Sequence, residues 1–167
     1  MKKISIFIIL FAFISCKNSK KNTDIPQLKI DDLKRDILNH QDNESYGIFQ
    51  DLSANDSLNY EPLSFSLILA EKNNPRANFF VFYYMVAIFN NNRFEIDSLK
   101  NLSEVNKNFA LHYLKEGAKI NEFSSRTHLE EIYRRGIGIE KNEKKADSIL
   151  SIIKKNDKSY VPDYELK

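Results

Sequence analysis

Apolar residues recur at helical spacing along most of this chain. From residue 60 onward, five segments follow one template, in which apolar or small residues occupy positions i, i+3, i+4 and i+7. The five sets begin at Leu63, Phe80, Ala110, Leu129 and Ala146. This spacing places all four residues on one face of an α-helix, so each segment is predicted to be a helix. The recurrence of one template indicates an internal repeat.

Two more helices are expected before the repeat. Ile30, Leu33 and Ile37 stand at i, i+3 and i+7 within residues 24–39, as in an amphipathic helix. Residues 40–59 are less regular and suggest one further short helix. The folded part is therefore expected to contain about six or seven helices and to be all-α.

The segment 79–89 is the one place where a β-strand competes with a helix. Its residues are nearly all apolar, and many are aromatic or β-branched, which favours strands. A helix is favoured because Pro75 fits a first helical turn, Asn73 and Asn74 can cap it, and no second run of this kind is present to pair with. We predict a central helix that neighbours cover on two sides, with a strand as the alternative.

A compact motif stands near the C-terminal end of the repeat. The apolar positions of one helix are followed by two glycines, an asparagine that can cap a helix, and a Lys-Ala pair. Positive φ angles at the glycines would end one helix and reverse the chain within few residues. This order of residues resembles the Sel-one-like repeat, a relative of the tetratricopeptide repeat. The positions in register with that family are Leu129, Ile132, Tyr133, Gly136, Gly138, Ile139, Asn142, Lys145 and Ala146.

An earlier copy of the same plan is visible upstream. Tyr84 fits its first helix and Ala110 its second, and Ala110 lies 36 residues before Ala146, which is the period of the family. About 13 extra residues separate its two helices, so we expect a loop insertion near residues 90–105. The resemblance covers about residues 60–155. It implies a short α-solenoid of stacked antiparallel helix pairs that binds another protein.

The stacking of helices also explains why small and aromatic residues occur at these positions. The small side chains of Ala110 and Ala146 let helix axes approach closely, while Tyr84 and Tyr133 fill the facing grooves. Glu130 departs from the family, which prefers glycine there, so we expect looser packing of that helix on its neighbour.

The loop insertion is the expected place for a partner, because loops on a rigid scaffold often carry binding residues. Arg93, Phe94 and Ile96 form the candidate partner-binding set. The two apolar residues could be exposed anchors, or they could pack beneath the loop.

The first sixteen residues have the layout of an export signal. Lys2 and Lys3 precede an apolar stretch over residues 4–14, and Cys16 is the only cysteine. Eleven helical residues span about 16 Å, so this stretch cannot be a stable transmembrane anchor. The order resembles a bacterial lipoprotein signal, which implies lipid attachment at Cys16 and cleavage before it. The alternative is an ordinary secretory signal with an incidental cysteine.

These features divide the chain into parts and suggest where in the cell the protein is located. The expected parts are a signal peptide (1–15), a lipid-anchored flexible tether (16–23), an N-terminal helical cap (24–59), the helical repeat region (60–157) and a C-terminal tail (158–167). No aspartate follows Cys16, which in lipoproteins of this type suggests the outer membrane, with the domain facing the periplasm.

The net charge of +2 comes from the signal alone. The chain has 25 lysines and arginines against 23 aspartates and glutamates, and without Lys2 and Lys3 each sign counts 23. A neutral domain has no bulk positive field, so we do not expect nucleic-acid binding. Specificity then depends on shape and on local charge pairs.

No set of residues indicates catalysis, a bound metal or a cofactor. The three histidines form no i, i+4 pair and stand beside no second cysteine, and glycine-rich phosphate loops are absent. His112 and His128 are expected to be exposed on polar helix faces. We therefore expect a non-catalytic protein with a protein partner, as an adaptor or an immunity protein. An envelope hydrolase is the alternative.

Overall fold

The computed structural model describes residues 27–53 and 60–166. Within these ranges the chain forms seven α-helices and two short 3-10 helices, and no β-strand. The α-helices are α1 (Gln27–His40), α2 (Asn43–Ser53), α3 (Glu61–Glu71), α4 (Pro75–Ile88), α5 (Glu104–Lys119), α6 (Phe123–Arg135) and α7 (Glu143–Asn156). The 3-10 helices are η1 (Ile96–Asn101) and η2 (Asp163–Glu165).

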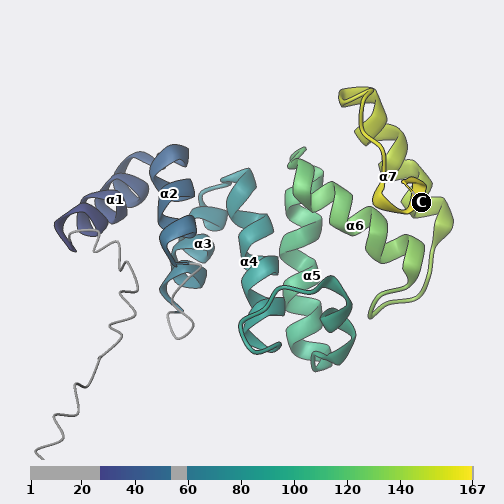
Figure 1. The fold of residues 1–167 in the computed structure, drawn as a ribbon, viewed down its shortest axis with the longest axis horizontal. Helices are drawn as coiled ribbons and strands as arrows, with labels where there is room; N and C mark the ends of the chain where they lie inside the picture. The colour runs from purple at the N-terminus through teal and green to yellow at the C-terminus, as the bar shows by residue number, and fades with distance from the viewer. Residues whose placement is uncertain (1–26, 54–59, 167) are drawn as a thin grey trace, which may run out of the picture.

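The helices follow one another along the long axis of the molecule, from α1 at one end to α7 at the other (Figure 1). Each packs mainly on its neighbours in the sequence, and α4 also contacts α6. The expected fold class, a short α-solenoid of about six or seven helices in antiparallel pairs, is confirmed. The cap predicted over residues 24–59 contains α1 and α2, while residues 24–26 and 54–59 lie outside the described part.

The helix α4 occupies the centre of the stack. The side chain of Asn74 accepts a hydrogen bond from the Ala77 amide at 3.1 Å, and Pro75 is the first helical residue. The prediction of a helix was right, and the alternative of a strand over residues 79–89 was wrong. The helix joins two core clusters, because Val81 packs towards the α1–α3 side and Phe82 towards the α5–α6 side.

Residues in the left-handed backbone conformation, with positive φ angles, form the turns between the repeat helices. Asn73 and Asn121 have φ angles of 61° and 70°, and Gly136 has a φ of 70° at the end of α6. The Gly136 and Ile137 amides both donate to the Ile132 carbonyl oxygen, which closes the last turn of that helix. The predicted glycine turn is therefore present. Asparagine serves in the other two turns because it tolerates this conformation better than other non-glycine residues.

Small residues bring the helices of the repeat into close contact. Ala110 and Ala146 are fully buried, as the sequence predicted. Among the glycines, the tightest site is Gly117 on α5. A Cβ atom there would lie 3.0 Å from the Cβ of Ser125 on α6 and 3.1 Å from the Cβ of Asn78 on α4. Three helices therefore meet at one position that has no room for a side chain.

The loop insertion is largely folded onto the core. Leu99 of η1 is fully buried and Leu102 nearly so. Phe94 and Ile96 are half-buried and pack against the same cluster, so neither is a fully exposed anchor. Arg93 is exposed. Gly138 lets the loop approach, because a Cβ atom there would lie 3.3 Å from the Leu99 carbonyl oxygen.

The C-terminal tail folds back onto α6. The hydroxyl of Tyr164 donates to Glu130 at 2.9 Å, and the ring of Tyr160 lies 5.6 Å from the ring of Phe123. Glu130 is only 1% exposed. Arg134 pairs with this carboxylate and Tyr164 donates to it, so Glu130 holds the tail against the helix.

Candidate functional site

A groove runs across α2, α4 and α6. It consists of three neighbouring hollows of about 620, 360 and 590 Å³. The first two share Phe79 and Phe80, the first and third share Phe123, and the second and third share His128. We call this continuous surface the α2–α4–α6 groove.

Four aromatic side chains of α4 form the central wall of the groove. Phe79, Phe80, Tyr83 and Tyr84 are all half-buried. The ring of Phe94, from the loop insertion, stacks on Tyr83 with 4.6 Å between the centroids. These rings hold one another in place and still face a hollow, so they can offer aromatic contacts to a bound molecule.

A chain of buried hydrogen bonds holds α2, α3 and α4 together behind this wall. The Tyr84 hydroxyl donates to the Gln50 amide oxygen, and the Gln50 amide nitrogen donates to Ser66 Oγ at 3.4 Å. Ser66 Oγ donates in turn to the Pro62 carbonyl oxygen at 2.6 Å. Tyr46 must then be the donor in its 2.7 Å contact with Ser66, because the single hydroxyl proton of Ser66 is already used. Burial raises the pKa of Tyr46.

Replacing Ser66 with alanine is expected to reduce the free energy of unfolding by about 1–3 kcal/mol, because the buried Tyr46 hydroxyl loses its acceptor. Urea denaturation followed by circular dichroism measures this. The matched control is Ser64→Ala on the same helix, whose hydroxyl makes an exposed bond. It is expected to cost less than about 0.5 kcal/mol. Equal effects of the two variants would contradict the role assigned to Ser66.

His128 projects from α6 into the aromatic wall. Its ring centroid lies 5.0 Å from that of Phe79 and 5.6 Å from that of Phe94. Its Nδ1 lies 2.8 Å from the Ser124 carbonyl oxygen, which can only accept, so Nδ1 is the donor of this hydrogen bond. The expectation of an exposed histidine was wrong here, because α4 and the loop insertion cover the ring; His112 is exposed as predicted.

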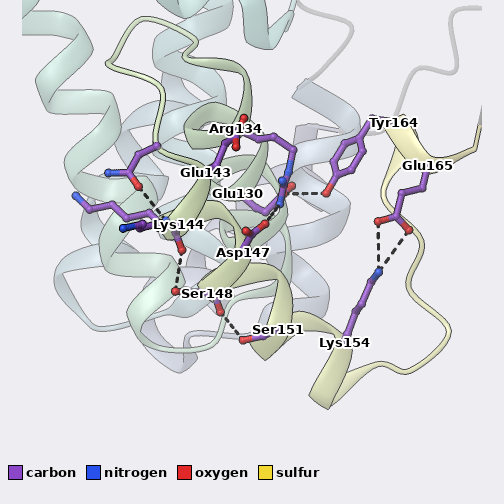
Figure 2. A network of polar contacts seen from close by, with 12 residues as sticks. Glu130, Arg134, Glu143, Lys144, Asp147, Ser148, Ser151, Lys154, Tyr164 and Glu165 are labelled. Atoms are coloured by element: carbon purple, nitrogen blue, oxygen red, sulfur yellow. Dashed lines mark hydrogen bonds and ion pairs between the residues drawn. The ribbon is translucent and has the colours of Figure 1, made fainter.

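The third hollow ends at a polar cluster that joins α6, α7 and the tail (Figure 2). Arg134 pairs with Glu130 and with Asp147, the second at 2.8 Å, and its guanidinium lies 5.0 Å from the ring centroid of Tyr164. A further ion pair, between Lys154 of α7 and Glu165 at 3.4 Å, also holds the tail. The cluster fixes the tail as one wall of the groove.

Stability is expected to fall as the pH rises from about 10 to about 12. Burial, the hydrogen bond to Glu130 and the charge of that carboxylate raise the pKa of Tyr164 to about 12, whereas an ordinary tyrosine has a pKa near 10. In this window the unfolded chain loses the Tyr164 proton and the folded chain keeps it. The contribution of Tyr164 is therefore complete below pH 10 and is lost above it.

Urea denaturation at several pH values tests this expectation. The stability difference between the wild type and Tyr164→Phe should shrink between pH 10 and pH 12. The control variant Tyr60→Phe, which removes an exposed hydroxyl, should follow the wild type. A difference that stays constant across the window would contradict the assignment.

The structure separates the predicted site residues into two groups. Gly136, Gly138, Tyr133, Ala146 and Ala110 lie in the turn and in the packing between helices, away from the groove. Of the predicted residues, Tyr84 and Phe94 line the groove. Cys16 lies outside the described residues, and Arg93 and Ile96 line none of the three hollows.

Sequence reasoning missed the main wall of the groove. The sequence predicts that neighbours cover this helix on two sides, yet Phe79, Phe80 and Tyr83 are half-buried and face the hollows. The sequence signal, apolar residues on every side of the helix, is the same for a fully covered helix, so it does not single out these residues.

Two absences concern the described part of the chain, residues 27–53 and 60–166. No group of three or more histidine, cysteine, aspartate or glutamate side chains there could hold a metal ion. No helix in these ranges is both long and apolar enough to cross a bilayer. Comparisons with protein-family models, curated proteins and solved structures find no match to this chain.

Proposed function

We propose that this chain is a lipid-anchored protein of a bacterial cell envelope that binds another protein in the α2–α4–α6 groove and has no catalytic activity. The observation that carries the proposal is the continuous groove walled by half-buried aromatic side chains. Stacked helix pairs present extended surfaces of this kind to peptides and proteins. Aromatic residues are also enriched where such partners bind.

Kinship with the Sel-one-like repeats is part of the proposal. It is supported by the motif of residues 129–146 and by its local geometry. Gly136 and Gly138 have φ angles of 70° and 67°, and the side chain of Asn142 caps α7 by accepting from the Lys145 amide at 3.0 Å.

The proposed anchor is a lipid on Cys16, after removal of residues 1–15, with residues 16–23 as tether and the domain on the periplasmic side of the outer membrane. Growth with a labelled fatty acid tests it. Label should enter the wild type and be absent from Cys16→Ser. Equal labelling of both proteins would contradict the anchor.

Photo-crosslinking in intact cells tests the binding role. Phe123 is 47% exposed and belongs to two hollows of the groove. Phe109 on α5 is 40% exposed and lines none of the three hollows. Azidophenylalanine at position 123 should crosslink a specific protein, and the same group at position 109 should not.

The identity of the crosslinked protein separates the two versions of the proposal. A secreted toxin would make this chain an immunity protein, whereas a resident component of the envelope would make it an adaptor. Identical products from positions 109 and 123, or none from either, would overturn the proposed groove.

A further inference from the structure

We propose that the central hollow of the groove is a seat for one cationic side chain of the partner, a guanidinium or an ammonium group. This inference rests on the proposed function and adds the chemistry of the bound group. The hollow has a volume of about 360 Å³ and lies between α2, α4 and the loop insertion. That volume is at the small end for ligand sites, which suits one side chain.

The walls of the hollow are aromatic. Phe79, Phe80, Tyr83 and Tyr84 contribute from α4, and Phe94 contributes from the loop. The face of an aromatic ring carries negative electrostatic potential and attracts cations, most strongly where water is partly excluded. The ring faces that border the hollow favour a cation over an anion of the same size, although the faces of Tyr83 and Phe94 that stack on each other are not available.

The only ionised carboxylate at the hollow is that of Asp51, among the described residues that line it. Asp51 is exposed and forms no ion pair with a described cation. Among the described residues, no lysine or arginine lines the hollow, and the guanidinium of Arg76 lies in the neighbouring one. A partner cation would therefore meet one negative charge among the described residues that line the hollow.

Gln50 and Nδ1 of His128, which also border the hollow, are already engaged in hydrogen bonds within the protein. Gln50 uses its amide oxygen for Tyr84 and its amide nitrogen for Ser66. His128 uses Nδ1 for the Ser124 carbonyl oxygen. The rings and Asp51 therefore decide which group is preferred.

The protein itself places a guanidinium on this aromatic surface. The Cζ of Arg76 lies 5.6 Å from the ring centroid of Phe80, in the neighbouring hollow. The same kind of contact is thus compatible with the local geometry. A partner arginine or lysine would extend it to the rings that Arg76 does not cover.

Titration of the full chain with short blocked peptides tests the inference. The peptides are acetyl-Gly-Arg-Gly-amide and its counterparts with Gln, Leu or Glu at the centre, and the aromatic proton signals are followed by NMR. The Arg peptide is expected to shift the tyrosine ring signals and to bind about five- to tenfold more tightly than the Gln and Leu peptides. Equal affinities, or a preference for Leu or Glu, would overturn the inference.

Two variants locate the site. Asp51→Asn removes the exposed carboxylate, and Tyr83→Leu keeps an apolar side chain but removes an aromatic face. Each should reduce the preference for Arg over Gln to less than about threefold. Glu71→Gln makes the same change of charge at an exposed position on α3 and should leave the preference intact. A preference that survives in both Asp51→Asn and Tyr83→Leu would overturn the assigned location.

The two proposals fail in different ways. A crosslink from position 123 without any preference for Arg would leave the proposed function standing and overturn the cation seat. A preference for Arg that depends on Asp51, without a crosslinked protein, would support the seat and count against the protein partner.

Discussion

Replacing Gly117 with alanine should destabilise the domain by about 2–3 kcal/mol, although alanine is the better helix former by nearly 1 kcal/mol. The reason is the meeting of α4, α5 and α6 at this position. The added Cβ would overlap Ser125 Oγ and press against the Cβ of Asn78 at 3.1 Å. These atoms belong to well-packed helices, so relief requires the helices to move apart. Urea denaturation of the two proteins measures the loss.

A rescue and a control make this expectation specific. Ser125→Gly removes two of the three atoms that the added Cβ would meet, the Oγ and Cβ of Ser125, so the double variant Gly117→Ala/Ser125→Gly should recover part of the lost stability. Gly47→Ala is the same substitution on α2, where the nearest atom is the flexible end of Arg76 at 3.4 Å. It should be neutral or stabilising by up to about 1 kcal/mol. A loss at Gly47 as large as that at Gly117 would contradict the steric explanation.

Removing Arg134 should cost about 3 kcal/mol, because Glu130 would remain buried without its cation. Glu130 is 1% exposed, and Arg134 is the basic residue that pairs with it. Arg134→Ala also removes the contact of the guanidinium with the Tyr164 ring, so the tail should detach from α6 as stability falls. Thermal denaturation measures the first effect, and amide hydrogen exchange in residues 158–166 measures the second.

The neighbouring Arg135 provides the control. It forms two ion pairs, with Asp97 and Glu131, but its side chain is 43% exposed. Arg135→Ala is therefore expected to cost less than about 1 kcal/mol. Replacing both partners, as Glu130→Leu with Arg134→Met, should restore much of the stability that Arg134→Ala loses. Equal losses for Arg134→Ala and Arg135→Ala would show that the buried carboxylate does not matter.

The helices could be predicted from the sequence because their signals are local. Asn74 and Pro75 fix the start of α4, and Gly136 fixes the end of α6, within a few residues of the chain. The close packing at Ala110 and Ala146 could also be predicted, because small residues that recur at the family's period are expected where helix axes approach closely. These features depend on one helix or on one turn.

The groove could not be predicted because it depends on how far neighbouring helices cover α4. Periodicity shows that α4 is apolar on every side, but not that Phe79 and Tyr83 are left half-covered. The buried Glu130 is a second example. Its hydrogen bond to Tyr164 joins residues 34 positions apart, which the spacing within one helix cannot reveal. Both features belong to the tertiary arrangement.

The linear order of contacts also has a consequence for how the molecule opens. Because each helix packs mainly on its sequence neighbours, the stack can fray from one end while the rest stays folded. The terminal pair α1 and α2 carries Asp51 and Gln50, so fraying at this end would open one wall of the central hollow. A molecule bound between α2 and α4 would join the terminal pair to the centre and make the whole array unfold more cooperatively. Binding in the groove would then stabilise α1 and α2, the end of the stack nearest the proposed tether, against fraying.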